Sequence, residues 1–258
     1  MTSRISAITL NTFREAVRDR VLYNLIVFVL LLVASAPLFS QISIGMERLI
    51  LVNVGLSAIS LFGVLIAIFI GIGLVSKEIE KRTLYTILSR PVCRWEFIAG
   101  KYFGLVLTLV VNALLMTAGF YIALFVTDKG LNASDGWLLL AVYFSVLEFL
   151  IMTAVTLLFS SFSTPIFSAI FAFSLFVIGS FADDLRNFAA LSHGATQWVA
   201  TAVAYLVPNF ASLNVISRVA HDQHVTASLI LYNTGYALLY SAAVIFGAVL
   251  IFERRNLK

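Results

Sequence analysis

One acidic residue lies in the middle of a long apolar run. Glu148 is the only charged residue between Trp137 and Ser160. An ionisable side chain at that depth in a bilayer costs about 3 kcal/mol by insertion scales and usually faces the interior of a helix bundle. Polar or flexible residues recur on the same helical face at three- and four-residue spacing, at Ser145, Met152, Thr156 and Ser160. Two interpretations of Glu148 and Thr156 stay open: a site lining a substrate path or subunit seam, and a hydrogen-bonded acid that joins helices.

The longest run of charge, from Ser76 to Lys101, lies between two apolar segments. Its first part, Ser76 to Ser89, predicts a short amphipathic helix, with leucines on one face and charges crowding its start. We expect this helix to end at Arg90-Pro91, because the residue before a proline avoids helical backbone. A charged helix held between two spans would carry force from outside the bilayer into the membrane.

Cys93 and Glu96 mark the predicted start of the next helix. Glu96 occupies the acidic position of a capping box, three residues after the capping residue. A cysteine caps a helix poorly compared with a serine, so this start is atypical.

The sequence has no complete motif for metal binding, nucleotide binding or hydrolysis. His221-x-x-His224 puts two imidazoles on one helical face, but no second Cys or His pair completes a metal-ligand set, so we predict no metal site. The chain has no G-x-x-x-x-G-K-[ST] loop, so we expect it not to bind nucleotide phosphates itself. No serine-histidine-aspartate order suggests a hydrolase, and we predict that the chain is not an enzyme.

Composition defines the elements that must position these residues. The 258-residue chain is 61% hydrophobic and 12% charged, whereas soluble domains carry about a quarter charged residues. Spans need about 20 apolar residues each. We therefore predict a single all-α domain over residues 1–258, a polytopic membrane protein with six transmembrane helices near Val21–Ile44, Leu49–Val75, Ile98–Val126, Trp137–Ser160, Ile166–Ala182 and Leu229–Phe252.

The placement of Lys and Arg predicts the orientation. Thirteen of the 17 basic residues lie in the N-terminal arm, the Ser76–Lys101 segment and the C-terminus. Basic residues stay on the cytoplasmic side, so we expect both termini in the cytoplasm of a multi-pass protein of the inner (plasma) membrane. The net charge of +4 then reflects topology, and we predict no nucleic-acid partner.

Two segments outside the spans also carry a pattern. Residues 1–20 form either an amphipathic interface helix or a plain topogenic arm. The outer segment, 183–227, is too long for a bare loop, and its apolar run from Trp198 to Val207 is too short to cross, so we expect re-entrant or surface helices there. The break at Pro208-Asn209-Phe210 separates them.

Small and aromatic residues recur within the spans. Gly63, Ala67 and Gly71 follow a four-residue spacing that lets helices approach closely, as do Gly100 and Gly104. The last span carries a tyrosine stripe, at Tyr232, Tyr236 and Tyr240, which we expect to serve packing.

The run from Glu78 to Lys101 resembles the signature of the permease subunits of ABC-2-type ATP-binding-cassette transporters. An acidic helix leads into Thr83-Leu84, a Leu88-Ser89-x-Pro91 exit, an Arg94-x-Glu96 start and the pair Gly100-Lys101. Within the family, the chain is most similar to the branch containing the permease of nitrous-oxide-reductase maturation systems. Arg82 stands where many relatives have glycine, and Cys93 stands where serine is usual.

The resemblance implies a coupling helix, within residues 76–97, that rests in a groove of a cytosolic ABC ATPase subunit. The residues implied in that contact are Glu78, Glu80, Arg82, Thr83, Leu84, Leu88, Arg90 and Pro91. ATP and magnesium would be bound by the ATPase, with no cofactor on this chain. A second permease, identical or related, would complete the membrane path, and an exporter is expected.

Two alternatives stay open. One is a proton- or ion-coupled secondary transporter that uses Glu148. The other is a non-transporting membrane subunit that transmits force. The substrate is not encoded in any motif of the sequence.

Overall fold

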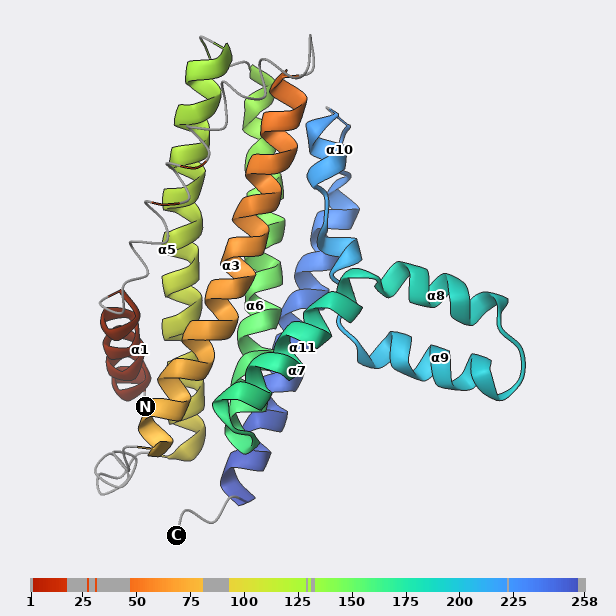
Figure 1. Cartoon of the computed structure of the whole chain (residues 1–258). Helices are drawn as coiled ribbons and strands as arrows, with labels where there is room; N and C mark the ends of the chain where they lie inside the picture. Colours follow the sequence, from red (N-terminus) through yellow and green to blue (C-terminus); the bar gives the residue numbers. More distant parts are fainter. Residues whose placement is uncertain are drawn as a thin grey trace.

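The computed structural model describes residues 2–17, 27, 31, 47–80, 93–128, 130, 133–221 and 223–254, and within these ranges every regular element is a helix. The bundle consists of α3 (Glu47–Glu80), α5 (Arg94–Asp128), α6 (Leu138–Phe162), α7 (Pro165–Ser180) and α11 (Ala227–Arg254) (Figure 1). The shorter elements are α1 (Thr2–Ala16), η2 (Ala133–Trp137), α8 (Ala182–Leu191), α9 (Ala195–Leu206), η3 (Ala211–Leu213) and α10 (Ile216–Ala220). The all-α prediction is confirmed for this part of the chain.

Four of the predicted spans are confirmed by length and composition. Helical stretches long and apolar enough to cross a membrane cover Arg48–Gly73, Trp95–Thr127, Asp135–Phe162 and Ala227–Glu253. The predicted first span, Val21–Ile44, lies outside the described residues except for Val27 and Leu31. The chain is a polytopic membrane protein, with the bundle as its membrane part.

The predicted fifth span, Ile166–Ala182, corresponds to α7, which is a short helix. α7 has 16 residues, which is about 24 Å at 1.5 Å per residue and shorter than a bilayer's hydrocarbon core. The chain then bends by 62° into α8. A second bend, of 47°, follows α9 before residues Ala211–Ala220. The described chain therefore has four clear spans, or up to six if each bent pair counts as one.

α8 and α9 form an antiparallel hairpin that leaves the bundle sideways (Figure 1). The two helices meet through Ala189, Ala200 and Ala204, which are buried. The opposite face of α9 exposes Trp198 and Tyr205. The expectation of re-entrant or surface helices in residues 183–227 agrees with these short, bent helices.

α6 lies at the centre of the bundle and is the most buried of the long helices. It packs along α3 and α11, and also contacts α5 and α7. Glycines set its distance from α3, because a Cβ at Gly63 would overlap the ring of Phe149 and a Cβ at Gly71 would come within 2.8 Å of Thr156 Cγ2. The predicted small-residue spacing on the second span is thus a close helix contact inside this chain.

α1 packs on the first turns of α5 rather than lying alone. A Cβ on Gly100 would come within 2.6 Å of Ile8 Cγ2, and one on Gly104 within 2.8 Å of Thr12 Cγ2. Thr9 also donates a hydrogen bond to the carbonyl of Gly100 (3.3 Å). The apolar face predicted for the N-terminal helix therefore packs against α5.

The predicted coupling helix is not a separate element at its start. α3 continues without a break to Glu80, so Ser76 to Glu80 form the end of the span's helix, and residues 81–92 lie outside the described chain. Lys and Glu are strong helix formers, and no glycine or proline follows Gly73 until Pro91. The helix therefore continues from apolar residues into charged residues without ending.

Candidate functional site

Glu148 lies at the middle of α6 and is 9% exposed. Its Oε2 accepts a hydrogen bond of 2.6 Å from the hydroxyl of Ser60 on α3. Ser60 reaches the carboxylate because Gly63, one turn further along α3, lets the two backbones come close. The helix-joining role considered for Glu148 is therefore present in the structure.

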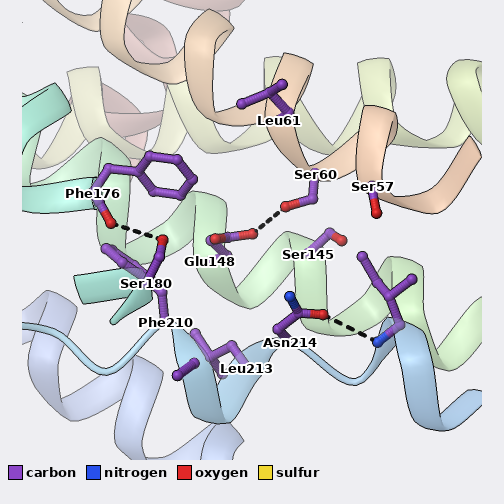
Figure 2. Close-up of a pocket in the computed structure, with 12 residues that line it drawn as sticks. Ser57, Ser60, Leu61, Ser145, Glu148, Phe176, Ser180, Phe210, Leu213 and Asn214 are labelled. Atoms are coloured by element: carbon purple, nitrogen blue, oxygen red, sulfur yellow. Dashed lines mark hydrogen bonds between the residues drawn. The ribbon is translucent and has the colours of Figure 1, made fainter. Parts of the chain in front are cut away.

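Glu148 also faces a cavity of about 170 Å³ between α3, α6, α7 and the segment that follows α9. Figure 2 shows Ser57 and Ser60 from α3 and Ser145 and Glu148 from α6 directed toward the same space. Its polar lining consists of Ser57, Ser60, Ser145, Glu148, Ser180 and Asn214, and aromatic and aliphatic side chains complete the wall. Polar side chains in a membrane span gather where a path or a buried contact needs them, so both interpretations of Glu148 apply to the same residue.

Three of the four lining serines donate their hydroxyl protons to groups of the protein. Ser145 donates to the carbonyl of Ala141 (3.1 Å), and Ser180 donates to the carbonyl of Phe176 (2.9 Å). Ser60 donates to Glu148. A hydroxyl that donates elsewhere can only offer oxygen lone pairs to a ligand. These three serines therefore offer the cavity hydrogen-bond acceptors, whereas Asn214 also carries an NH2 donor.

The ends of two helices, α7 and α9, build the wall of the cavity opposite α6. The backbone N–H of Phe210 donates to the carbonyl of Gly179 (3.1 Å), and a Cβ on Gly179 would lie 2.5 Å from the carbonyl oxygen of Pro208. The end of α7 and the break after α9 are therefore in direct contact, and each supplies lining residues, Ser180 and Phe210. Both ends of the α8–α9 hairpin thus meet at the cavity.

Tyrosines of α11 hold this junction. The hydroxyl of Tyr236 accepts the backbone N–H of Asn209 (2.9 Å), and the hydroxyl of Tyr240 donates to the carbonyl of Leu206 (2.9 Å). Asn209 also donates to Asp183 at the start of α8 (3.3 Å). Tyr236 and Tyr240 of the predicted stripe pack against the core, and their hydroxyls attach the hairpin to the last span, whereas Tyr232 is exposed.

The remaining residues of the predicted polar stripe lie away from the cavity. Thr156 is fully buried against Gly71 and donates to the carbonyl of Met152 (2.7 Å). Ser160 is buried and bonds within its own helix, to the carbonyl of Leu157. Periodicity places five positions of α6 on one face, but only Ser145 and Glu148 among them line the cavity.

The implied ATPase contacts are described only in part. Glu78 and Glu80 lie in the last turns of α3. The other six, Arg82, Thr83, Leu84, Leu88, Arg90 and Pro91, lie outside the described residues. The helix start that follows is confirmed, because the backbone N–H of Cys93 donates to Glu96 Oε2 (3.1 Å) and α5 begins at Arg94.

Two charged pairs are not evident from the sequence. Lys101 is 1% exposed, and its Nζ lies 3.6 Å from Glu15 of α1. At the opposite end of the bundle Arg48 pairs with the buried Asp135. A hint for the first pair is present, since the glycines Gly100 and Gly104 flank Lys101 and mark a helix contact, whereas nothing in the sequence assigns α1 as the partner.

The histidines are held separately. His221 is hydrogen-bonded through Nδ1 to the carbonyl of Ser217 (2.8 Å), and the ring of His224 lies 5.7 Å from that of Trp137. His193 lies in the turn between α8 and α9. Across the described ranges, no group of three or more His, Cys, Asp or Glu is placed to hold a metal ion.

Comparison with known proteins gives one match. The family described as "ABC-2 family transporter protein" matches residues 6–257, nearly the whole chain. The match includes the bundle, the hairpin and the cavity. A search of curated proteins finds no match.

Proposed function

Because the chain belongs to the ABC-2 family of transporter proteins, we propose that it is the permease subunit of an exporter powered by a separate ATPase. The chain supplies the membrane path, and the partner binds ATP and magnesium. A family match over residues 6–257 carries this proposal. The absence of a phosphate-binding loop from the sequence supports the division of labour.

α3 offers a route from the ATPase to the cavity. It is one unbroken helix of 34 residues, with Glu78 and Glu80 at one end and Ser60 near its middle. The 20 residues between Ser60 and Glu80 span about 30 Å. A displacement of the Glu80 end would tilt α3 and change the Ser60–Glu148 contact.

α5 and α1 would support this movement on the other side of residues 81–92. α5 is a single helix of 35 residues, and its start is fixed by the Glu96 cap and by α1. We propose that residues 76–97 act as the coupling region, as the family resemblance implies. The two long helices that flank it would then move with the ATPase.

A second permease fits the open side of the cavity. Ser57 and Ser180 are exposed at this face, and Leu61 is 47% exposed. Polar side chains of a span seldom face lipid, so we propose that a second copy or a related permease covers this face. The path would then run between two permeases, with Glu148 beside it.

The same proposal sets the orientation. Both termini and residues 76–97 would lie in the cytoplasm of a cell whose inner membrane holds the bundle, as the distribution of Lys and Arg indicates. The α10 end of the bundle would face outward. From the Glu78–Lys101 signature, we also propose that the chain belongs to the branch of the family that contains the permease of nitrous-oxide-reductase maturation systems.

Charge reversal at the end of α3 tests the ATPase contact. In a Glu78→Lys, Glu80→Lys variant we expect the ATPase to co-purify poorly and its stimulated hydrolysis to fall at least tenfold. A control is Asp184→Lys at the start of α8, a charge reversal at an exposed acid of the hairpin. Unchanged co-purification and hydrolysis in the α3 variant would contradict the contact.

A secondary transporter is the rival that the cavity favours, because a buried carboxylate is the usual coupling group for a proton or ion. The two functions differ in whether transport requires ATP. Transport that continues without ATP or the ATPase, and that Glu148→Gln abolishes, would establish the rival. Transport that stops when the ATPase is omitted supports the permease.

A further inference from the structure

The charge balance of the Glu148 cavity is incomplete. Among the described residues that line it, Glu148 is the only titratable group, and no Lys, Arg or His is present. An ionised carboxylate at this depth needs a positive partner, because burying an isolated charge is very costly. The Ser60 hydrogen bond supplies one donor, and the other carboxylate oxygen faces the remaining polar lining (Figure 2).

Serine hydroxyls near the Glu148 carboxylate also favour a positively charged partner. The protons of Ser145 and Ser180 point to backbone carbonyls of their own helices, so their lone pairs are left for the cavity. Asn214 differs from the serines, because its Oδ1 accepts the backbone N–H of Ile216 (3.3 Å) and its NH2 group is a hydrogen-bond donor at the rim. One negative charge beside the lone pairs of Ser60, Ser145 and Ser180 is complementary to a cation and unfavourable for an anion.

We propose that this cavity binds a monovalent cation, either an inorganic ion or the primary ammonium group of a larger solute, with Glu148 as its counter-ion. The inference deepens the proposed function, on which its role in transport rests, by giving the charge of the group that enters the path. A single carboxylate balances one positive charge and leaves the site neutral in the membrane. Calcium and magnesium sites usually use more anionic oxygens, and zinc sites use nitrogen or sulfur ligands that the lining lacks.

The site is built from four separate parts of the chain. α3 supplies Ser57 and Ser60, α6 supplies Ser145 and Glu148, the end of α7 supplies Ser180, and the segment after α9 supplies Asn214. A cation bound there would therefore tie α3 to α6, α7 and the base of the hairpin. Occupancy should increase the stability of the bundle, since a ligand that binds only the folded state stabilises it.

Binding can be measured on the purified full-length chain in lipid nanodiscs, without the ATPase. Thermal unfolding would be followed during titration with sodium, potassium or methylammonium chloride, with tetramethylammonium chloride at equal ionic strength as the bulky reference. We expect saturable stabilisation by at least one of the three small cations and none by tetramethylammonium. Sodium or potassium alone would indicate an inorganic ion, and methylammonium would indicate an ammonium group of a larger solute.

Variants assign the effect to the cavity. We expect Glu148→Gln to weaken binding at least tenfold, and Ser60→Ala and Ser145→Ala to weaken it about threefold each. Ser160→Ala, a buried serine of the same helix outside the cavity, should leave the affinity unchanged. Equal stabilisation by tetramethylammonium, or the same affinity in Glu148→Gln, Ser60→Ala and Ser145→Ala, would overturn the proposal.

The ATPase experiment keeps the two claims apart. Saturable, Glu148-dependent binding together with an ATPase that the chain neither binds nor stimulates would leave the cation site standing and remove the ABC permease function. Stimulated ATP hydrolysis with no cation-dependent stabilisation in the wild type would do the reverse.

Discussion

The hydroxyl of Ser60 and the carboxylate of Glu148 meet across 2.6 Å at the middle of the bundle. The contact joins α3, whose end carries the acids predicted to meet the ATPase, to α6, the most buried helix. It also forms one side of the cavity. The same hydrogen bond is therefore a packing contact between helices and part of the candidate site.

The α3–α6 contact can be tested at Gly63. In Gly63→Ala the new methyl group would overlap the ring of Phe149, and overpacking a tight contact typically costs about 1–3 kcal/mol. We expect a lower Tm in nanodiscs and a weaker response of the ATPase. Gly73→Ala is the matched control, because a Cβ there meets no atom within 4 Å. Equal Tm values for the two variants would show that α3 and α6 are not in close contact.

The packing of α1 against α5 can be tested by thiol labelling. Thr12 is fully buried against Gly104, so in a Cys93→Ser background Thr12→Cys should react slowly with a water-soluble reagent. Adding Gly104→Val should displace α1 and speed the reaction at least tenfold. Gly235→Val, at a glycine of α11 with open space around it, should leave the rate unchanged. Fast labelling of Thr12→Cys alone would contradict the docked position.

The attachment of the hairpin depends on Tyr236. Tyr236→Phe removes the acceptor of the Asn209 backbone N–H, and an unsatisfied buried donor costs about 1–3 kcal/mol. We expect faster cleavage of the hairpin by protease and a lower Tm. Tyr232→Phe is the control, since Tyr232 is 71% exposed. A protease pattern identical for the two variants would remove the proposed anchor.

The start of α5 can be improved by one substitution. Glu96 already accepts the N–H of Cys93, and a serine at 93 would add the second bond of a capping box, which is worth about 0.5–2 kcal/mol. We expect Cys93→Ser to raise the Tm and Cys93→Ala to leave it unchanged or lower. The opposite order would show that position 93 does not cap the helix.

The sequence is sufficient for four of the six predicted spans because their signal is local. Length and apolar composition located the long helices, and the spacing of Gly63, Ala67 and Gly71 located a close contact. The sequence does not predict the extension of α3 to Glu80, because a change from apolar to charged residues is typical of the end of a span. Backbone hydrogen bonds continue through such a change when no glycine or proline interrupts them.

The site could be predicted only in part. Burial of Glu148 followed from its position in an apolar run, but its donor, Ser60, is 88 residues away in sequence. Periodicity puts Thr156 and Ser145 on one face of α6, whereas the packing of α3 places Thr156 against Gly71 and leaves Ser145 at the cavity. Arg48–Asp135 and Lys101–Glu15 are likewise pairings between distant segments.

The central claim is that ATP hydrolysis in a partner moves α3 at the cavity, and accessibility of position 60 tests it most directly. In the reconstituted complex, Ser60→Cys in a Cys93→Ser background would be labelled with a water-soluble thiol reagent, with and without ATP and magnesium. His193→Cys, in the exposed turn of the hairpin, serves as the reference position. We predict a change of at least threefold in the labelling rate at position 60 when ATP is bound, with no change at 193. An identical rate at position 60 with and without ATP would contradict the account.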